Sequence, residues 1–313
     1  MSEFLSQSGL LKGVKIIDTT INLPGPVAGA ILGMLGAVIT KIESSSGDPV
    51  SSSPALYRTI NGMKNRIRLD LHNPQDKQEF LRLVSEADGI LVGMRPTALA
   101  KLGLDYEILK AINPKLIYCH VAGFPKDSKK KGTPGHDLTY LAESGLLSTL
   151  FSDLTKVTTQ PADMTGALYT AIAFLSGLQF RNSTGTGTSI EINLYESPAI
   201  LGLIPNHDNR LSKNLQGDQI CYRVYETADG WIALGALEEK FFNSFVQAID
   251  HPEWMGKGDK LAEPGDEIFE AMKKIFKSQP SGYWVSIGAQ HDVPLEEVRS
   301  LSPSKEFSLP YRF

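Results

Sequence analysis

The sequence has little cysteine, no excess of positive charge and no long apolar run. Among its 313 residues only Cys119 and Cys221 are cysteines, and their separation matches no metal-ligand spacing. We therefore expect no metal site, two unpaired thiols and a reducing, cytoplasmic location. The net charge of −4 and the pI near 5.9 argue against general nucleic-acid binding. No apolar run is long enough to cross a bilayer, and the N-terminus lacks the pattern of a signal peptide, so we expect no membrane association.

The dinucleotide-binding fingerprint is also missing. The glycines Gly25, Gly29, Gly33 and Gly36 do not match G-x-G-x-x-G, so the sequence does not indicate NAD. We interpret them instead as small residues that let a helix pack closely on a sheet. Strands expected at 14–18, 38–42, 66–71, 89–92 and 116–121 alternate with helices expected at 27–35, 74–85, 97–102 and 106–111. This alternation predicts an α/β fold, with a large doubly wound, Rossmann-like domain over residues 1–200.

The remaining chain has a different pattern. We expect a long helix from Pro161 to about Phe180, a turn at 182–187, a strand at 188–193 and a linker over 201–219. Strands at 222–227 and 231–235, joined by Ala228-Asp229-Gly230, predict a hairpin. Helices are expected at 238–249, 267–278 and 281–289. Together they predict a smaller α+β domain over residues 220–313.

A glycine- and proline-rich loop delivers His136 and Asp137 to the start of a helix, in the stretch GTPGHDLTYLAESGLLS. We expect Asp137 to be the N-cap, with the imidazole beside free backbone N–H groups. Such a position suits proton transfer and the stabilisation of a developing negative charge. A helix cap beside an ordinary surface histidine is the alternative. Asp163 lies in the first turn of the next long helix. It either takes part in catalysis or only stabilises the helix through its favourable interaction with the helix dipole.

Basic residues are expected where the strands end. In doubly wound sheets ligands bind beyond the carboxyl ends of the strands, and we expect the loops there to carry Lys41, Lys64, Arg66 and Arg95. Each base alone would be a solvated surface charge. Several of them on one side predict a phosphate-binding place.

These stretches together resemble the family III coenzyme A transferases and their isomerase branch, the α-methylacyl-CoA racemases. The resemblance covers nearly the full length. It rests on GVKIIDTTINLPGPVAGAILGMLGAVITKIE, KNRIRLDLHNPQ, MRPTALAKLGLDYEILKAINPKLIYCHVAGF, GTPGHDLTYLAESGLLS, STGTGTSIEINLYE and YETADGWIALGALEEKFF. The resemblance implies an acyl-CoA enzyme of fatty-acid and lipid metabolism, with coenzyme A as part of the substrate and no prosthetic group.

The choice of branch depends on three positions: the His136-Asp137 pair, Asp163 and Glu238. The resemblance implies that His136 and Asp163 are the proton carriers of a racemase, that Glu238 in GALEE holds His136, and that Asp137 supports the site. The residue after Glu238 is Glu239, where racemases often have proline. The implied reaction is inversion of the α-carbon of a 2-methylacyl-CoA through an enolate. The alternatives are a CoA-transferase that uses Asp137 as its nucleophile, and a non-catalytic acyl-CoA-binding protein.

The resemblance also implies how substrate and subunits bind. Family members form an interlocked homodimer, so Glu238 is expected to act across the interface. The coenzyme is expected to contact Pro26, Lys41, Lys64, Arg66, Arg95 and Tyr140.

Overall fold

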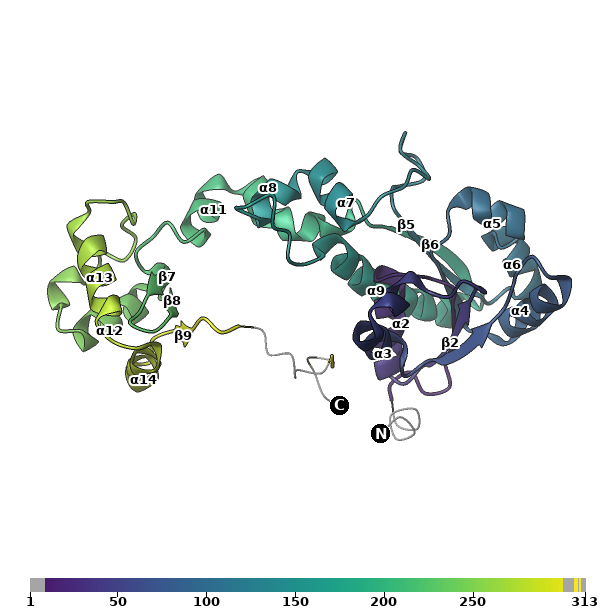
Figure 1. Ribbon diagram of the computed structural model, residues 1–313, viewed down its shortest axis with the longest axis horizontal. Coiled ribbons are helices and arrows are strands. Elements are labelled where there is room, and N and C mark those ends of the chain that lie inside the picture. Colours follow the sequence, from purple (N-terminus) through teal and green to yellow (C-terminus); the bar gives the residue numbers. More distant parts are fainter. Residues whose placement is uncertain (1–8, 301–306, 309, 311–313) are drawn as a thin grey trace. The chain divides into compact units, whose positions relative to one another are not determined.

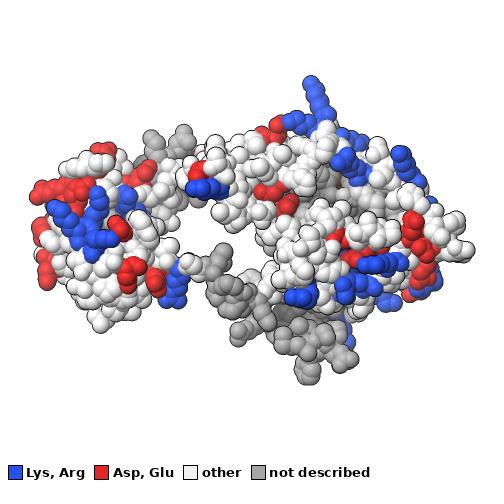
Figure 2. Space-filling model, viewed as in Figure 1, with Lys and Arg blue, Asp and Glu red and all other residues white. Residues whose placement is uncertain are grey.

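The structure is a computed structural model that describes residues 9–300, 307–308 and 310. The chain divides into two compact units, the first ending at Gly202 and the second beginning at Leu203 (Figure 1). On the face shown in Figure 2, acidic and basic side chains are interspersed over each unit. In the described part of the chain, no helix combines the length and the apolar character that crossing a bilayer requires.

The first unit contains a six-stranded parallel sheet, which confirms the predicted α/β class. Its strand order is β3-β2-β1-β4-β5-β6, and every neighbouring pair is parallel. The order changes direction between β1 and β4, where a doubly wound sheet leaves a crevice for ligands. The strands are β1 (Lys15–Asp18), β2 (Val38–Glu43), β3 (Asn65–Arg68), β4 (Gly89–Val92), β5 (Ile117–Ala122) and β6 (Thr188–Asn193).

Helices cover both faces of this sheet, as Figure 1 shows. One core lies between the sheet and the helices α2 (Pro24–Met34), α3 (Pro54–Asn61) and α9 (Pro161–Thr184). The other lies beneath α4 (Pro74–Glu86), α5 (Pro96–Leu102) and α6 (Tyr106–Ile112). A Cβ at Gly177 of α9 would lie 2.6 Å from Ile117 Cγ2 of β5. The absence of a side chain there lets α9 lie close to the sheet.

Some local predictions for this unit are wrong. Between the strands expected at 38–42 and 66–71 no helix was predicted, but the chain forms the 3₁₀ turn η1 (Pro49–Ser52) and then α3 there. The strand expected at 66–71 ends at Arg68. The turn expected at 182–187 begins later, because α9 continues to Thr184 and ends at Gly185, whose φ of +77° favours glycine. The helices α7 (Asp137–Ser144) and α8 (Leu146–Leu150) and the turn η2 (Ser197–Gly202) complete the unit.

The second unit contains the expected hairpin and a third strand. Strands β7 (Tyr222–Glu226), β8 (Trp231–Gly235) and β9 (Leu295–Glu297) form an antiparallel sheet. Strand β9 was not predicted, since three residues give almost no period-2 signal. The stretch expected as a linker contains the short helices α10 (Leu203–His207) and α11 (Asn209–Leu215). The other helical elements are α12 (Glu239–Ala248), η3 (Pro252–Trp254), α13 (Glu267–Lys277) and α14 (Ser281–His291).

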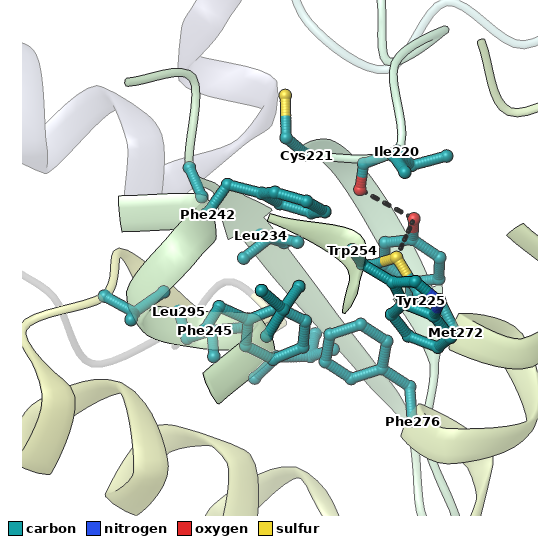
Figure 3. Close-up of a cluster of buried hydrophobic side chains, with 14 of the residues drawn as sticks. Ile220, Cys221, Tyr225, Leu234, Phe242, Phe245, Trp254, Met272, Phe276 and Leu295 are labelled. Carbon is teal, nitrogen blue, oxygen red and sulfur yellow. Dashed lines mark hydrogen bonds between the residues drawn. The ribbon is translucent and has the colours of Figure 1, made fainter. Parts of the chain in front are cut away.

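Aromatic side chains form the core of this second unit (Figure 3). The Phe276 ring stacks on Phe245, with ring centroids 5.3 Å apart, and on Tyr225, with centroids 4.6 Å apart. The buried Tyr225 hydroxyl donates a hydrogen bond to the carbonyl of Ile220 at 2.7 Å. The unit therefore has its own apolar core and a satisfied polar group within it.

Candidate active site

The candidate site lies at the carboxyl edge of the parallel sheet. Loops that follow β1, β4 and β5 meet there around a cavity of about 280 Å³. His136, Asp163, Tyr140 and Arg95 line this cavity. The structure thus brings together the two proposed proton carriers and two of the residues expected to bind coenzyme A.

His136 is the N-cap of α7, which corrects the prediction that Asp137 would hold this place. The backbone N–H of His136 donates to Thr139 Oγ1 at 3.0 Å, and that hydroxyl donates back to the His136 carbonyl at 2.7 Å. Thr139 therefore performs the local capping that was expected of the aspartate. The His136 side chain is exposed and faces the cavity.

Asp137 caps the following long helix instead of its own. Its Oδ1 accepts the backbone N–H groups of Ala162 at 2.7 Å and of Asp163 at 3.0 Å, at the start of α9. The side chain is buried, and burial raises its pKa while these two hydrogen bonds oppose the rise. Asp137 thereby ties the helix that begins beside His136 to the helix that presents Asp163.

Asp163 is the third residue of α9 and is only partly exposed. Burial, with the nearby negative charge of Asp137, raises the pKa of Asp163 to about 7. Both the protonated acid and the carboxylate are therefore accessible near neutral pH. A group that must donate and accept a proton in alternate turnovers needs such a pKa.

A second cavity, of about 550 Å³, adjoins the first. His136 and Asp163 line it too, together with Asn22. Asp137 and Gln160 also line it, and its other walls are apolar and come from Leu23, Pro49, Val50, Leu56, Leu138 and Val157. This apolar cavity could not be predicted from the sequence, because its walls come from five separate parts of the chain and two of those, η1 and α3, were not predicted.

Lys41 and Lys64 do not present free ammonium groups at the strand ends, contrary to the prediction. Both side chains are fully buried among carboxylates. Lys64 Nζ lies 2.8 Å from Asp18 Oδ2, and Lys41 Nζ lies 3.1 Å from Asp48 Oδ2. Burial alone would raise the pKa of Asp18, but the two ammonium groups hold it below its ordinary value. These lysines form a buried ion cluster beside the site.

The ion cluster fixes the loop between β1 and α2. Lys41 donates to the carbonyl of Thr20 at 2.6 Å, and Lys64 donates to the carbonyl of Pro26 at 2.7 Å. Pro26 therefore contributes its buried backbone oxygen to this network. A buried charge is tolerated when it is paired and hydrogen-bonded, as here.

Breaking this cluster is expected to be costly. In Lys64→Met the side-chain volume is nearly kept, but Asp18 loses its 2.8 Å partner and remains buried. We expect the free energy of unfolding to fall by about 3–5 kcal/mol. Urea unfolding followed by circular dichroism measures this. Lys15→Met, at an exposed pair with Glu86, is the control and is expected to change stability by less than about 1 kcal/mol. A Lys64→Met protein as stable as the wild type would contradict the role of the cluster.

The other predicted residues differ in exposure. Arg95 is exposed and lines the smaller cavity, whereas Arg66 is exposed on β3, where it donates to the Tyr57 hydroxyl at 3.3 Å. The ring of Tyr140 is buried against the backbone of the active-site loop, so a Cβ at Gly135 would lie 2.5 Å from its Cε1. Burial raises the pKa of Tyr140, and Asp163 adds to the rise while Arg95 opposes it.

Glu238 belongs to the second unit, where it precedes α12 as its N-cap and is exposed. The two cavities of the candidate site are lined by residues of the first unit alone. Within the residues that the structure describes, no three His, Cys, Asp or Glu side chains gather as metal ligands would.

The fold and site define a doubly wound α/β protein that carries an imidazole and a carboxyl group at the carboxyl edge of its sheet. The model of the family "CoA-transferase family III" matches residues 11–305. The chain therefore belongs to CoA-transferase family III.

The sequence is similar to proteins that are named for different activities. It is 28% identical over 291 residues to a CaiB/baiF CoA-transferase family protein of Caenorhabditis elegans, covering 88% of this chain and 82% of that protein. It is 27% identical over 275 residues to the succinyl-CoA:mesaconate CoA-transferase of Haloarcula hispanica, covering 78% and 68%. It is 29% identical over 294 residues to the human alpha-methylacyl-CoA racemase, covering 88% and 74%.

Solved structures show the same fold. The crystal structure of Rv3272 from Mycobacterium tuberculosis matches with a TM-score of 0.81 and 25% identity, covering 94% of this chain and 84% of that one. A CAIB/BAIF family protein from Brucella suis matches with a TM-score of 0.79 and 25% identity, covering 94% and 85%.

Proposed function

We propose that the protein is a racemase or epimerase that inverts the α-carbon of 2-methylacyl-CoA thioesters. The observation that carries this proposal is that His136 and Asp163 line the same cavity while the pKa of Asp163 is raised to about 7. Inversion needs a base on one face of the carbon and an acid on the other. One side chain is an imidazole and the other is a carboxyl group that can carry a proton at neutral pH, so the pair suits that exchange.

The α-hydrogen of a thioester is acidic because the carbanion delocalises into the carbonyl group. In one direction neutral His136 takes the proton, the C–H electron pair moves into the carbonyl as an enolate, and protonated Asp163 returns a proton to the opposite face. In the other direction the carboxylate of Asp163 is the base and the imidazolium of His136 is the acid. Asp137 supports the pair by holding the start of α9 against that of α7. Each well-placed acid or base contributes about 10²- to 10⁴-fold.

Coenzyme A would bind at the sheet edge, with its phosphates near exposed cations. Among the residues predicted to contact coenzyme A, Arg95 and Arg66 are exposed. Lys41 and Lys64 are instead buried in ion pairs with carboxylates. We therefore expect the two arginines to bind the phosphates and Tyr140 to line the thioester end. The apolar cavity beside the proton carriers suits an acyl chain.

We further propose that the chain acts as a homodimer, in which Glu238 of one subunit would orient His136 of the other. Support for a dimer comes from the exposed apolar side chains Met164, Leu168, Ile172 and Leu175, which follow one another at helical spacing along α9. Leu168 and Ile172 are 54% and 55% exposed, which is costly for an unpartnered helix face.

Charges on this stripe are expected to prevent association. The double variant Leu168→Asp/Ile172→Asp should shift the mass measured by light scattering after gel filtration from dimer to monomer, because association would bury two unpaired carboxylates. Ile108→Asp, at another exposed apolar position, is the matched control and should keep the wild-type mass. An unchanged mass in the double variant would show that α9 is not the dimer surface.

Exchange in heavy water tests the proposed reaction. We expect the wild-type protein to introduce deuterium at the α-position of either enantiomer of a 2-methylacyl-CoA, with no acceptor acid present. Mass spectrometry of the thioester measures the incorporation. No deuterium in either enantiomer, with full CoA binding, would contradict racemisation.

A CoA-transferase is the second candidate, because several similar proteins carry that name. Asp137 is the nucleophile expected for this candidate; it lines the larger cavity, but its carboxylate is buried and one of its oxygens accepts two backbone hydrogen bonds. Asp163 lines both cavities and is less buried than Asp137, so it is a second carboxyl group that a transferase could use. Transfer of CoA to an added carboxylic acid, with inactivation by hydroxylamine after acyl-CoA treatment, would support this candidate.

A further inference from the structure

Asn22 lies where the two cavities meet. Of the described residues, three line both the 280 Å³ and the 550 Å³ cavity, namely Asn22, His136 and Asp163. The other two are the proposed proton carriers. A substrate carbon that lies between an imidazole and a carboxyl group would therefore have Asn22 beside it as well.

The backbone of Asn22 is held in place by buried charges. Its φ is +65°, in the left-handed region that asparagine and glycine tolerate best. Its N–H donates to Asp48 Oδ1 at 3.0 Å, and Asp48 is paired with buried Lys41 at 3.1 Å. Lys41 also holds the carbonyl of Thr20, two residues earlier. The ion cluster beside the site thus fixes the loop that presents Asn22.

The side chain of Asn22, in contrast to its backbone, is free to bind a ligand. The hydrogen bond that Asn22 makes to Asp48 uses the backbone N–H. The side-chain carboxamide makes no hydrogen bond to any of the described residues. A carboxamide carries two N–H donors and no charge. It can donate to an oxygen that becomes negative without neutralising the carboxylate of Asp163.

We propose that Asn22 is a further catalytic residue, whose carboxamide N–H donates a hydrogen bond to the carbonyl oxygen of the bound CoA thioester. As the α-proton leaves, negative charge collects on that oxygen, and a donor fixed beforehand in a partly desolvated site stabilises it. This inference rests on the proposed function for the identity of the substrate. Loss of one such donor typically slows a reaction by about 10²- to 10³-fold.

The variant Asn22→Gly distinguishes the role of the side chain from that of the backbone. Glycine keeps the left-handed conformation without strain, so the loop and its bond to Asp48 are retained. We expect α-proton exchange to slow by about 10²-fold or more, while the urea midpoint stays within error of the wild type. Binding of 2,2-dimethylpropanoyl-CoA, which has no α-proton, should change less than about threefold, because the lost bond matters mainly in the transition state.

Two further variants sharpen the test. Asn22→Asp keeps the shape and the tolerance of positive φ but replaces donors by a negative charge, so the loss of exchange should be at least as large. Asp292→Gly, at another non-glycine residue with positive φ (54°), lies in the second unit outside both cavities and should exchange at the wild-type rate. An Asn22→Gly protein that exchanges as fast as the wild type would overturn the proposal, since only the backbone would then matter.

Failure of the proposed reaction can be told apart from failure of this inference. If the wild type moves CoA to an acceptor acid and shows no α-exchange, racemisation is wrong, but charge still develops on the same carbonyl oxygen. A loss of about 10²-fold in transfer by Asn22→Gly would then sustain the role of Asn22, and unchanged transfer would overturn it. A wild-type protein with neither activity overturns both.

Discussion

His136→Ala is expected to slow α-proton exchange from one enantiomer of a 2-methylacyl-CoA by about 10²- to 10⁴-fold. The reason is that His136 is the only histidine among the described residues that line the two cavities. No second imidazole there can therefore take over its proton transfer. Deuterium incorporation is measured separately for each pure enantiomer. One enantiomer reports proton abstraction by His136, and the other reports proton abstraction by Asp163. The other enantiomer should still lose its proton to Asp163, although racemisation as a whole should stop.

The control for this experiment is His72→Ala, since His72 is an exposed histidine of the same unit that lines neither cavity. It should exchange at the wild-type rate. His136→Ala should also bind 2,2-dimethylpropanoyl-CoA normally, because the imidazole acts on the α-proton. Equal, undiminished exchange from both enantiomers in His136→Ala would exclude it as a proton carrier.

Asp163→Asn is expected to remove exchange from the opposite enantiomer and, unusually for a substitution at a partly buried position, to stabilise the fold. In the direction where Asp163 is the base, the wild-type rate should rise with pH through about 7, as the carboxylate forms. In the direction where it is the acid, the rate should fall through the same range. Asparagine cannot ionise, so both dependences should vanish together with the activity of this group.

The stability effect follows from the raised pKa. The ordinary pKa of 3.8 applies to the unfolded chain and about 7 to the folded one, so the folded state binds more protons between these values. The free energy of unfolding therefore decreases as the pH rises from about 4 to about 7, and stays lower above that. At pH 8 we expect Asp163→Asn to exceed the wild type by a few kcal/mol, at most about 4. At pH 4 the two should be nearly equal.

Urea unfolding at pH 4, 6 and 8 measures this difference. Asp153→Asn is the control, because Asp153 is exposed and hydrogen bonds from Thr155 lower its pKa. Its removal should give no gain in stability at high pH. If Asp163→Asn shows the same difference from the wild type at all three pH values, the pKa of Asp163 is not raised in the folded protein.

The fold class could be predicted because it depends on local pattern. The apolar runs of β1, β4 and β5 are buried on both faces of a parallel sheet, and such strands are recognisable one at a time. The long helix α9 and the hairpin of β7 and β8 have equally strong signals. The elements that were missed, η1, α3, α10, α11 and β9, are short or exposed, and short segments acquire their structure from tertiary contacts.

The candidate site, like the fold, could be predicted from the sequence only in part. The position of His136 and of Asp163 at the starts of two helices is visible in the loop composition and in the residues that follow. The partner of Asp137 is not visible, because the backbone groups that it binds lie about 25 residues further along the chain. Likewise no local pattern shows that Lys41 and Lys64 face Asp48 and Asp18 in the interior, since a lysine near the end of a strand is ordinarily solvated.

The sequence by itself determined the alternation of strands and helices, the parallel sheet and the family, since these depend on periodicity and on the residues that begin and end each element. Only the tertiary structure decided which charges are buried, which carboxyl group has its pKa raised to about 7, and that Asn22 lines the same two cavities as His136 and Asp163. The physical reason is that desolvation and pairing depend on what surrounds a group in space. Those surroundings come from segments that are distant in the chain.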